Sequence, residues 1–377
     1  MNYRPFRDGA EVSALGFGCM RMPTYQVGGK SIIDRGKAIP MMRRAINSGV
    51  NYVDTAYGYH GGDSEKLVGE ALKDGYRDKV MLATKLPPWH LEKPEDMRKV
   101  FEEQRKRLGT DVIDVYLLHA LDKDNFAKVK RLGAFQFLDE LKKEGSIKYA
   151  GFSFHDDYET FKTIADAYPF DVCQIQLNIV DINEQATLQG MYYAAERGMT
   201  VVIMEPLRGG LLANVPDEAR SIYYNYPVKR SPVDWALRYM LNFPEVATVL
   251  SGMGAMEQVT ENLAICSNAA ANCMSEAELK VIDKVRICLS GRARVACTGC
   301  DYCLPCPQSV AISEVFELYN EAAIYNIWDR QRSQYKRRFA DGRGADRCVA
   351  CGTCEARCPQ KIHIAECLKE AGEALSV

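Results

Sequence analysis

Short apolar runs alternate with amphipathic segments over the first two thirds of the chain. Eight runs rich in Val, Ile and Leu have the length of buried strands. The segments between them repeat apolar residues at helical spacing, which predicts parallel strands joined by crossover helices. The strand runs are residues 15–20, 51–55, 80–85, 113–119, 147–152, 172–177, 200–204 and 246–251. The helical segments are residues 38–47, 64–73, 95–108, 128–143, 158–167, 184–197 and 232–241.

Eight parallel strands with right-handed crossovers close naturally into a (β/α)8 TIM barrel. The alternative is a doubly wound open sheet, which normally carries a GxGxxG turn after its first strand. Here the first run reads Gly16-Phe17-Gly18-Cys19-Met20-Arg21 and lacks the third glycine. The closed barrel is therefore the favoured fold class.

The chain is longer than one barrel needs. A barrel of about 250 residues leaves more than about 100 of the 377 residues for another domain. A helical segment at residues 275–289 completes the barrel, and the glycine and arginines of residues 290–294 are typical of a linker. We predict a barrel at residues 1–290 and a small, mainly helical, cysteine-rich domain at residues 291–377.

Composition adds few constraints. Charged residues make up 26% of the chain and the net charge is −2, so nothing points to a nucleic acid or a membrane surface as partner. The first residues show no apolar leader, and no run of about 18 apolar residues occurs. We expect a cytoplasmic protein.

Three neighbouring strand runs end in ionisable residues, namely Asp54, Lys85 and His119, and Tyr59 follows the first of them. The carboxyl ends of barrel strands meet on one face. Together these groups can deliver a proton to a carbonyl oxygen while a hydride reaches its carbon. A cation about 4 Å from a phenol favours the phenolate by about 4 kcal/mol at an effective dielectric of 20. We therefore expect Lys85 to lower the pKa of Tyr59, Asp54 to hold the ammonium, and His119 to polarise the carbonyl.

The stretch NYVDTAYGYHGGDSEKLVGE at residues 51–70, with LATK at 82–85 and DVYLLH at 114–119, resembles the aldo-keto reductase superfamily. The likeness covers about residues 5–265. It implies a (β/α)8 barrel that binds NADP or NAD without a Rossmann domain and reduces small-molecule carbonyls reversibly. It also implies that Asp54, Tyr59, Lys85 and His119 form the catalytic tetrad, with Tyr59 as the acid.

The resemblance extends to cofactor contacts. It implies that Ser153 and Gln176 meet the nicotinamide carboxamide, but the family's usual Asn after the Ser is Phe154 here, with His155 next. In the loop after the eighth strand, Gln258 stands where the family usually has a basic residue for the 2′-phosphate, so NADP and NAD both stay open. Further candidates in the loops after the seventh and eighth strands are Glu205, Leu207, Gly209, Ser251, Gly252 and Asn262.

Eight of the fourteen cysteines fall into two tight motifs. The second motif, CxxCxxCxxxCP, is the bacterial ferredoxin run, whose fourth cysteine ligates the other cluster in two-cluster proteins. The first motif has one residue fewer before its last cysteine. A structural zinc site is the alternative, although it usually needs two well-separated CxxC pairs. A resemblance to helical dicluster ferredoxin domains implies two [4Fe–4S] clusters. The expected ligands are Cys297, Cys300, Cys303, Cys306, Cys348, Cys351, Cys354 and Cys358.

A basic stretch lies between the two cysteine motifs, at residues 330–347. It can dock an acidic electron carrier such as a ferredoxin or flavodoxin, or form a solvated helix face that partly neutralises the thiolates. Three functions stay open: a nicotinamide-dependent reductase with accessory clusters, a ferredoxin-linked enzyme acting on an unusual substrate, and a nicotinamide-binding redox sensor. Trp89 either lines the substrate pocket or packs in the core.

Overall fold

The computed structural model describes residues 1–377. It divides into two compact units, residues 1–212 with 233–279, and residues 213–232 with 280–377. The second unit includes helix α8 (Asp217–Tyr224), which follows the seventh barrel strand and which the sequence pattern did not predict. The domain division at residues 290 and 291 stays a prediction. None of the helices combines the length and the apolar character that crossing a membrane requires.

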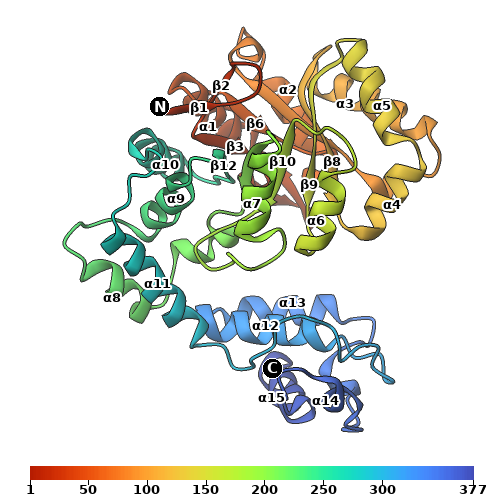
Figure 1. Cartoon of the computed structure of the whole chain (residues 1–377), viewed down its shortest axis with the longest axis vertical. Helices are drawn as coiled ribbons and strands as arrows, with labels where there is room; N and C mark the ends of the chain where they lie inside the picture. Colours follow the sequence, from red (N-terminus) through yellow and green to blue (C-terminus); the bar gives the residue numbers. More distant parts are fainter. The chain divides into compact units, whose positions relative to one another are not determined.

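The first unit contains a closed barrel of parallel strands in the order β10-β11-β12-β3-β6-β7-β8-β9, with helices outside it (Figure 1). All eight predicted strand runs form barrel strands, so the (β/α)8 prediction is confirmed and the open sheet is excluded. The barrel strands are β3 (Leu15–Gly18), β6 (Tyr52–Asp54), β7 (Met81–Leu86), β8 (Ile113–Leu121), β9 (Ile147–Phe154), β10 (Val172–Gln176), β11 (Thr200–Met204) and β12 (Val246–Ser251).

The barrel interior is packed with side chains rather than open. Tyr52, Val115, Leu117 and Val202 belong to one buried apolar cluster drawn from several strands. A Cβ atom added to Gly151 would lie 2.2 Å from the carbonyl oxygen of Val172, so β9 and β10 can approach only with glycine at this position. Helices cover the outer face, which explains why the strands read as continuous apolar runs.

The helices of the first unit follow the predicted segments, except that the helix at Met256–Asn268 was not predicted and one predicted helix is two helices. The single helix expected at residues 128–143 is wrong: Gly133, with φ of 83°, ends one helix and begins the next. The helices are α1 (Arg35–Asn47), α2 (Asp63–Ala71), α3 (Glu95–Leu108), α4 (Lys123–Arg131), α5 (Ala134–Lys143), α6 (Tyr158–Ala165), α7 (Thr187–Glu196), α9 (Pro232–Asn242), α10 (Met256–Asn268) and α11 (Glu276–Ser290), of which α11 continues into the second unit.

Two short hairpins were not predicted. Strands β1 (Tyr3–Pro5) and β2 (Glu11–Ser13) pair antiparallel, as do β4 (Thr24–Val27) and β5 (Lys30–Ile33). The turn of the second hairpin is Gly28-Gly29, with φ of 55° and 77°. A Gly-Gly pair between two strand-like runs is a recognised hairpin signal.

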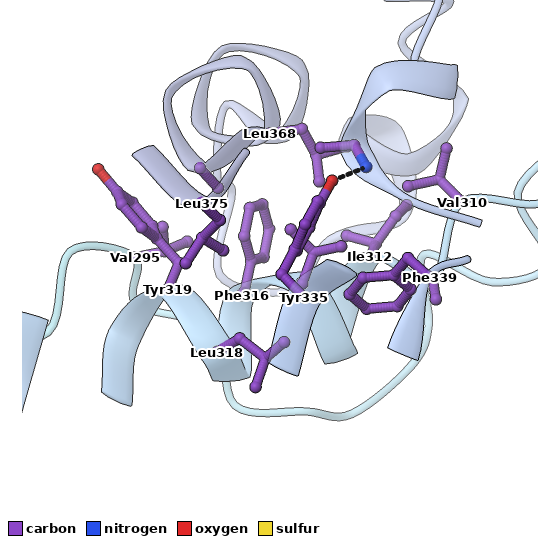
Figure 2. Close-up of a cluster of buried hydrophobic side chains, with 14 of the residues drawn as sticks. Val295, Val310, Ile312, Phe316, Leu318, Tyr319, Tyr335, Phe339, Leu368 and Leu375 are labelled. Carbon is purple, nitrogen blue, oxygen red and sulfur yellow. Dashed lines mark hydrogen bonds between the residues drawn. The ribbon is translucent and has the colours of Figure 1, made fainter. Parts of the chain in front are cut away.

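The second unit is mainly helical, as predicted for the cysteine-rich region. Its core gathers Phe316, Tyr335 and Leu368 from three helices (Figure 2). The Tyr335 hydroxyl accepts a hydrogen bond from Ala345 N at 2.7 Å, which ties the helix that carries Tyr335 to the chain just before Cys348. Its remaining helices are α12 (Ile312–Tyr325), α13 (Trp328–Arg338), α14 (Thr353–Arg357) and α15 (Ile364–Leu375).

Candidate active site and cysteine centre

A buried ion pair joins the ends of two neighbouring barrel strands. Asp54 is the last residue of β6, and Lys85 lies near the end of the adjacent β7. Lys85 Nζ donates to the two Asp54 carboxylate oxygens at 2.8 and 2.7 Å and to the carbonyl oxygen of Thr55 at 2.7 Å. Neither charged side chain is more than 4% exposed. With an acceptor for each of its three N–H bonds, the ammonium is held in one position.

Two rings lie beside this pair. Tyr59 begins the 3-10 helix η2 (Tyr59–Gly62), and Lys85 Nζ is 5.0 Å from the centroid of its ring. The imidazole of His119, from β8, has its centroid 6.1 Å from that of Tyr59. The structure thus brings together the four residues predicted from the sequence, which are Asp54, Tyr59, Lys85 and His119.

The protonation states of two of these groups follow from their surroundings. Burial lowers the pKa of His119 well below its ordinary value, and the charges of Lys85 and His155 lower it further, so the imidazole is neutral near pH 7. Its Nδ1 atom is buried without a hydrogen-bond partner. Burial lowers the pKa of Lys85, but Asp54 and Tyr59 raise it, and the net direction is upward. Lys85 therefore stays charged.

The pKa of Tyr59 is raised, not lowered. Burial is the largest cause, and the charge and hydrogen bond of Lys85 oppose it. The expectation that Lys85 makes the phenol acidic is therefore wrong in its net direction, because the cost of burying a phenolate outweighs the attraction of the ammonium. Tyr59 keeps its proton at neutral pH, which suits a group that donates a proton.

Ser153 and Gln176 lie at the ends of the neighbouring strands β9 and β10. Ser153 Oγ accepts a backbone N–H at 2.8 Å. Gln176 Nε2 donates to Asp181 Oδ2 at 3.2 Å, and its Oε1 accepts from Gln185 Nε2 at 3.0 Å. His155, which follows the Phe154 that replaces the family's usual Asn, has its Nδ1 3.2 Å from Gln185 Oε1 and so contacts the same glutamine. A nicotinamide carboxamide that binds here would have to hydrogen-bond to Ser153 and Gln176 in addition to these partners or in place of them.

The loop after β11 contains glycines, so a ligand can come close to its backbone. Its turns are closed by N–H groups that donate to the carbonyl oxygens of Glu205 and Leu207, and Gly209 has φ of 63°. A Cβ at Gly209 would lie 2.9 Å from Arg21 Nη2, and one at Gly252 would lie 3.2 Å from the stem of the same side chain. Arg21 thus places a positive charge between two loops lined by glycine, which fits the phosphates of a dinucleotide. Arg21 is not among the residues predicted from the sequence, although its position directly after the first strand was a usable signal.

The loop after β12 is fixed by its own side chains. Asn262, on α10, donates to Ser251 Oγ at 2.9 Å, and both residues are buried. The exposed Gln258 accepts a hydrogen bond from Gly254 N through its Oε1 at 2.8 Å. Gln258 therefore closes the turn before α10 and offers no positive charge there.

Trp89 lies beside the four clustered residues rather than in the core. It belongs to the 3-10 helix η4 (Pro88–His90), its ring centroid is 5.0 Å from that of His119, and it is 48% exposed. Of the two interpretations, the structure favours a residue at the rim of the candidate site.

In the second unit, four cysteines from both motifs line one cavity. They are Cys297, Cys300, Cys303 and Cys358, and the rest of the lining includes Ile312 and Phe316 of α12, the segment after Cys358, and the polar residues Asp301 and Gln360. Three come from the first motif and the fourth from the second, which is how two-cluster ferredoxins share ligands. The donors and their partly apolar surroundings fit an iron–sulfur cluster.

The other four motif cysteines lie outside this cavity. Cys306, Cys348 and Cys354 pack in or against the core of the second unit, and Cys351 is exposed. No three His, Cys, Asp or Glu side chains converge on a point that could hold one metal ion. A four-iron cluster does not need such a point, because each thiolate binds a different iron atom.

Comparison with known families accounts for most of the chain. The sequence model of the aldo/keto reductase family matches residues 14–286, and that of the 4Fe-4S dicluster domain matches residues 296–362. The two matches meet near the linker expected from the sequence.

Individual relatives agree with the first match. The oxidoreductase YqkF of Bacillus subtilis (strain 168) is 27% identical over 303 residues, which cover 72% of this chain and 92% of that protein. The NADH-specific methylglyoxal reductase of Escherichia coli (strain K12) is 28% identical, with 68% and 93% covered. The solved structure of the aldo-keto reductase AKR11C1 from Bacillus halodurans, in its holo form, is 28% identical with a TM-score of 0.64 and covers 76% of this chain and 96% of that one.

Proposed function

The chain belongs to the aldo/keto reductase family, and from this premise we propose that it reduces a small-molecule carbonyl, or oxidises the corresponding alcohol, by hydride transfer with a nicotinamide cofactor. The family makes it an NAD(P)-dependent oxidoreductase with a C-terminal 4Fe-4S dicluster domain. The observation that carries the proposal is the buried pair of Lys85 and Asp54, which lies beside Tyr59 and His119.

In this proposal Tyr59 is the general acid. A bound reduced nicotinamide supplies the hydride to the carbonyl carbon. The Tyr59 hydroxyl gives its proton to the carbonyl oxygen, the product is the alcohol, and solvent restores the proton. Lys85 stabilises the negative charge left on the phenol oxygen, and Asp54 keeps the ammonium in place. The neutral His119 donates a hydrogen bond to the carbonyl oxygen.

The same proposal assigns the cofactor contacts. Ser153 and Gln176 hold the carboxamide, and Glu205, Leu207 and Gly209 line the pyrophosphate. Arg21 adds the positive charge that a phosphate requires. The adenosine end of the cofactor contacts the loop after β12 and the start of α10, through Ser251, Gly252, Gln258 and Asn262.

We propose NADH as the preferred cofactor. Gln258 presents no charge to a 2′-phosphate, and its oxygen is already used within the loop. The Escherichia coli relative, which is 28% identical, is named as NADH-specific. Binding titrations should give a lower Kd for NADH than for NADPH, and the variant Gln258→Arg should narrow the difference. Tighter binding of NADPH to the wild type would contradict the preference.

For the second unit we propose two [4Fe–4S] clusters, one of them in the cavity lined by Cys297 and Cys358. One observation favours the alternative function, electron delivery from an acidic ferredoxin or flavodoxin. Helix α13 carries five basic residues and one acidic residue, while Tyr335 on its inner side packs in the core. Activity with reduced ferredoxin and no nicotinamide would support this alternative, whereas turnover that survives removal of iron would support accessory clusters.

The proposed function is tested with purified holoprotein, NADH and a panel of aldehydes and ketones. Wild-type protein should oxidise NADH in the presence of a carbonyl. The variant Tyr59→Phe should lower kcat by about 10³-fold while NADH still binds with unchanged Kd. A Tyr59→Phe variant as active as the wild type would remove Tyr59 from its role. Absence of any NADH binding would remove the nicotinamide proposal, whereas NADH binding without reduction of any carbonyl would favour the redox sensor over the reductase.

A further inference from the structure

A buried carboxylate lies behind the candidate catalytic residues and takes no part in the proton or hydride steps. Glu65, in the first turn of α2, is 0% exposed. Its Oε1 accepts from Thr84 Oγ1 at 2.7 Å and from Gln104 Nε2 at 2.8 Å, and its Oε2 accepts from Arg107 Nη1 at 3.1 Å. Burying a charged pair is costly unless its hydrogen bonds are complete. The role of the Glu65 carboxylate can therefore be inferred from the segments that its hydrogen-bond partners hold in place.

One branch of this network leads to Lys85. Thr84 precedes Lys85 on β7, and Gln104 Nε2 also donates to the carbonyl oxygen of Lys85 at 3.0 Å. Tyr116, on β8, donates from its hydroxyl to Gln104 Oε1 at 2.8 Å. Gln104 is itself fully buried. The end of β7, from which Lys85 reaches Asp54, is thus fixed from outside the barrel.

The other branch leads to the loop that carries Tyr59. Arg107 Nη1 also donates to the carbonyl oxygen of Tyr57 at 3.1 Å, and the guanidinium lies 4.2 Å from the centroid of the Tyr57 ring. A Cβ at Gly62 would be 3.3 Å from Arg107 Nη1. Tyr57 and Gly62 stand on either side of Tyr59 in the chain. Arg107 therefore holds one end of this loop by a hydrogen bond and packs closely against the other end.

Close packing of two helices makes the network possible. A Cβ at Gly69, on α2, would lie 2.7 Å from the carbonyl oxygens of Arg107 and Leu108, at the end of α3. Such a distance requires glycine. This close approach of α2 and α3 brings Glu65 within reach of Arg107. Glu65 and Gly69 lie one helical turn apart on α2, so the glycine allows the contact that the carboxylate makes.

We propose that Glu65 and Arg107 are positioning residues that set the placement of Tyr59 relative to Lys85. They connect the Tyr59 loop on one side and the end of β7 on the other to one buried ion pair. Neither contacts the reacting atoms. The inference rests on the proposed function only for its kinetic consequence, because the contacts that hold the loop exist without substrate.

The test uses Glu65→Gln, Arg107→Met and Arg107→Lys in the full-length holoprotein. Hydrogen–deuterium exchange of residues 56–62 is measured first, since it needs no activity. Exchange should be at least about tenfold faster in Glu65→Gln and Arg107→Met. In steady-state carbonyl reduction, kcat should fall at least about tenfold, while KM and the Kd of NADH stay within about twofold. Arg107→Lys, which keeps the charge, should recover part of both effects.

Asp114→Asn is the matched control. Asp114 is 3% exposed, accepts from Leu82 N at 2.9 Å and pairs with Arg77 at 2.6 Å, at the opposite ends of the same strands β7 and β8. It should lower the melting temperature as Glu65→Gln does, yet leave both loop exchange and kcat within about twofold of wild type. Equal effects of the two variants on loop exchange or on kcat would overturn the proposal. If no carbonyl is reduced by the wild type, the proposed function fails, and loop exchange alone still decides the role of Glu65 and Arg107.

Discussion

The barrel end and the cysteine-rich unit hold their functional groups in different ways. At the barrel end, strand pairing places Asp54 and Lys85 side by side, and protein atoms satisfy every N–H of the ammonium. In the second unit, the first cysteine motif lies in a segment without helix or strand, between α11 and α12. The barrel site is therefore formed by folding itself, whereas the cysteine site depends on what the thiolates bind.

The largest effect should come from breaking the buried ion pair. Lys85→Met leaves the Asp54 carboxylate buried without its partner, which costs about 3–5 kcal/mol of stability and abolishes carbonyl reduction. Urea denaturation measures the loss. The double variant Asp54→Asn with Lys85→Met should regain part of the stability, because no charge is then left unpaired. A double variant less stable than Lys85→Met would argue against the pair as the cause.

The contrasting change in the second unit is Cys358→Ser. Cys358 shares its cavity with three cysteines of the first motif, so one cluster should be lost and iron should fall from about eight to about four atoms per chain. Iron and sulfide quantitation on protein purified without oxygen measures this. NADH-dependent carbonyl reduction should persist. Cys367→Ser, outside both motifs, is the control and should keep its iron; an equal loss of iron in both variants would contradict the ligand assignment.

A smaller effect is expected from Arg21→Ala. Loss of one charged contact to a phosphate should raise the Kd of NADH about tenfold, or about 1.4 kcal/mol. A fluorescence titration measures the Kd. Arg21→Lys is the matched control and should bind NADH within about threefold of wild type. If Arg21→Ala binds as tightly as wild type, the guanidinium does not contact the phosphates.

The last effect concerns pH. Because the pKa of His119 is lowered in the folded protein, mainly by burial, the unfolded chain takes up a proton first as pH falls below about 6.5. The stability contributed by neutral His119 is thus present above that pH. It declines on acidification by at most about 1.4 kcal/mol per pH unit until the folded pKa is reached. Melting temperatures from pH 7 to pH 5 should fall less steeply in His119→Asn than in wild type. Equal slopes would show that His119 does not titrate in this range.

The strand pattern was sufficient to predict the barrel. Each of the eight apolar runs became a barrel strand, and the residues at three of their ends meet on one face. The helix expected at residues 128–143 failed because one residue, Gly133, adopts a left-handed conformation that apolar spacing does not report. Local signals thus predicted the barrel strands and most of the helices, but neither the two hairpins nor every break between helices.

The sequence by itself determined the fold class, the four clustered polar residues and the two cysteine motifs, because these depend on periodicity and short spacing. Only the tertiary structure decided the direction of the Tyr59 pKa, which depends on how much water is excluded around a phenol. Only the tertiary structure brought Arg21 to Gly209 and Glu65 to Arg107. Such pairings depend on how distant elements pack, and no local pattern in the chain encodes them.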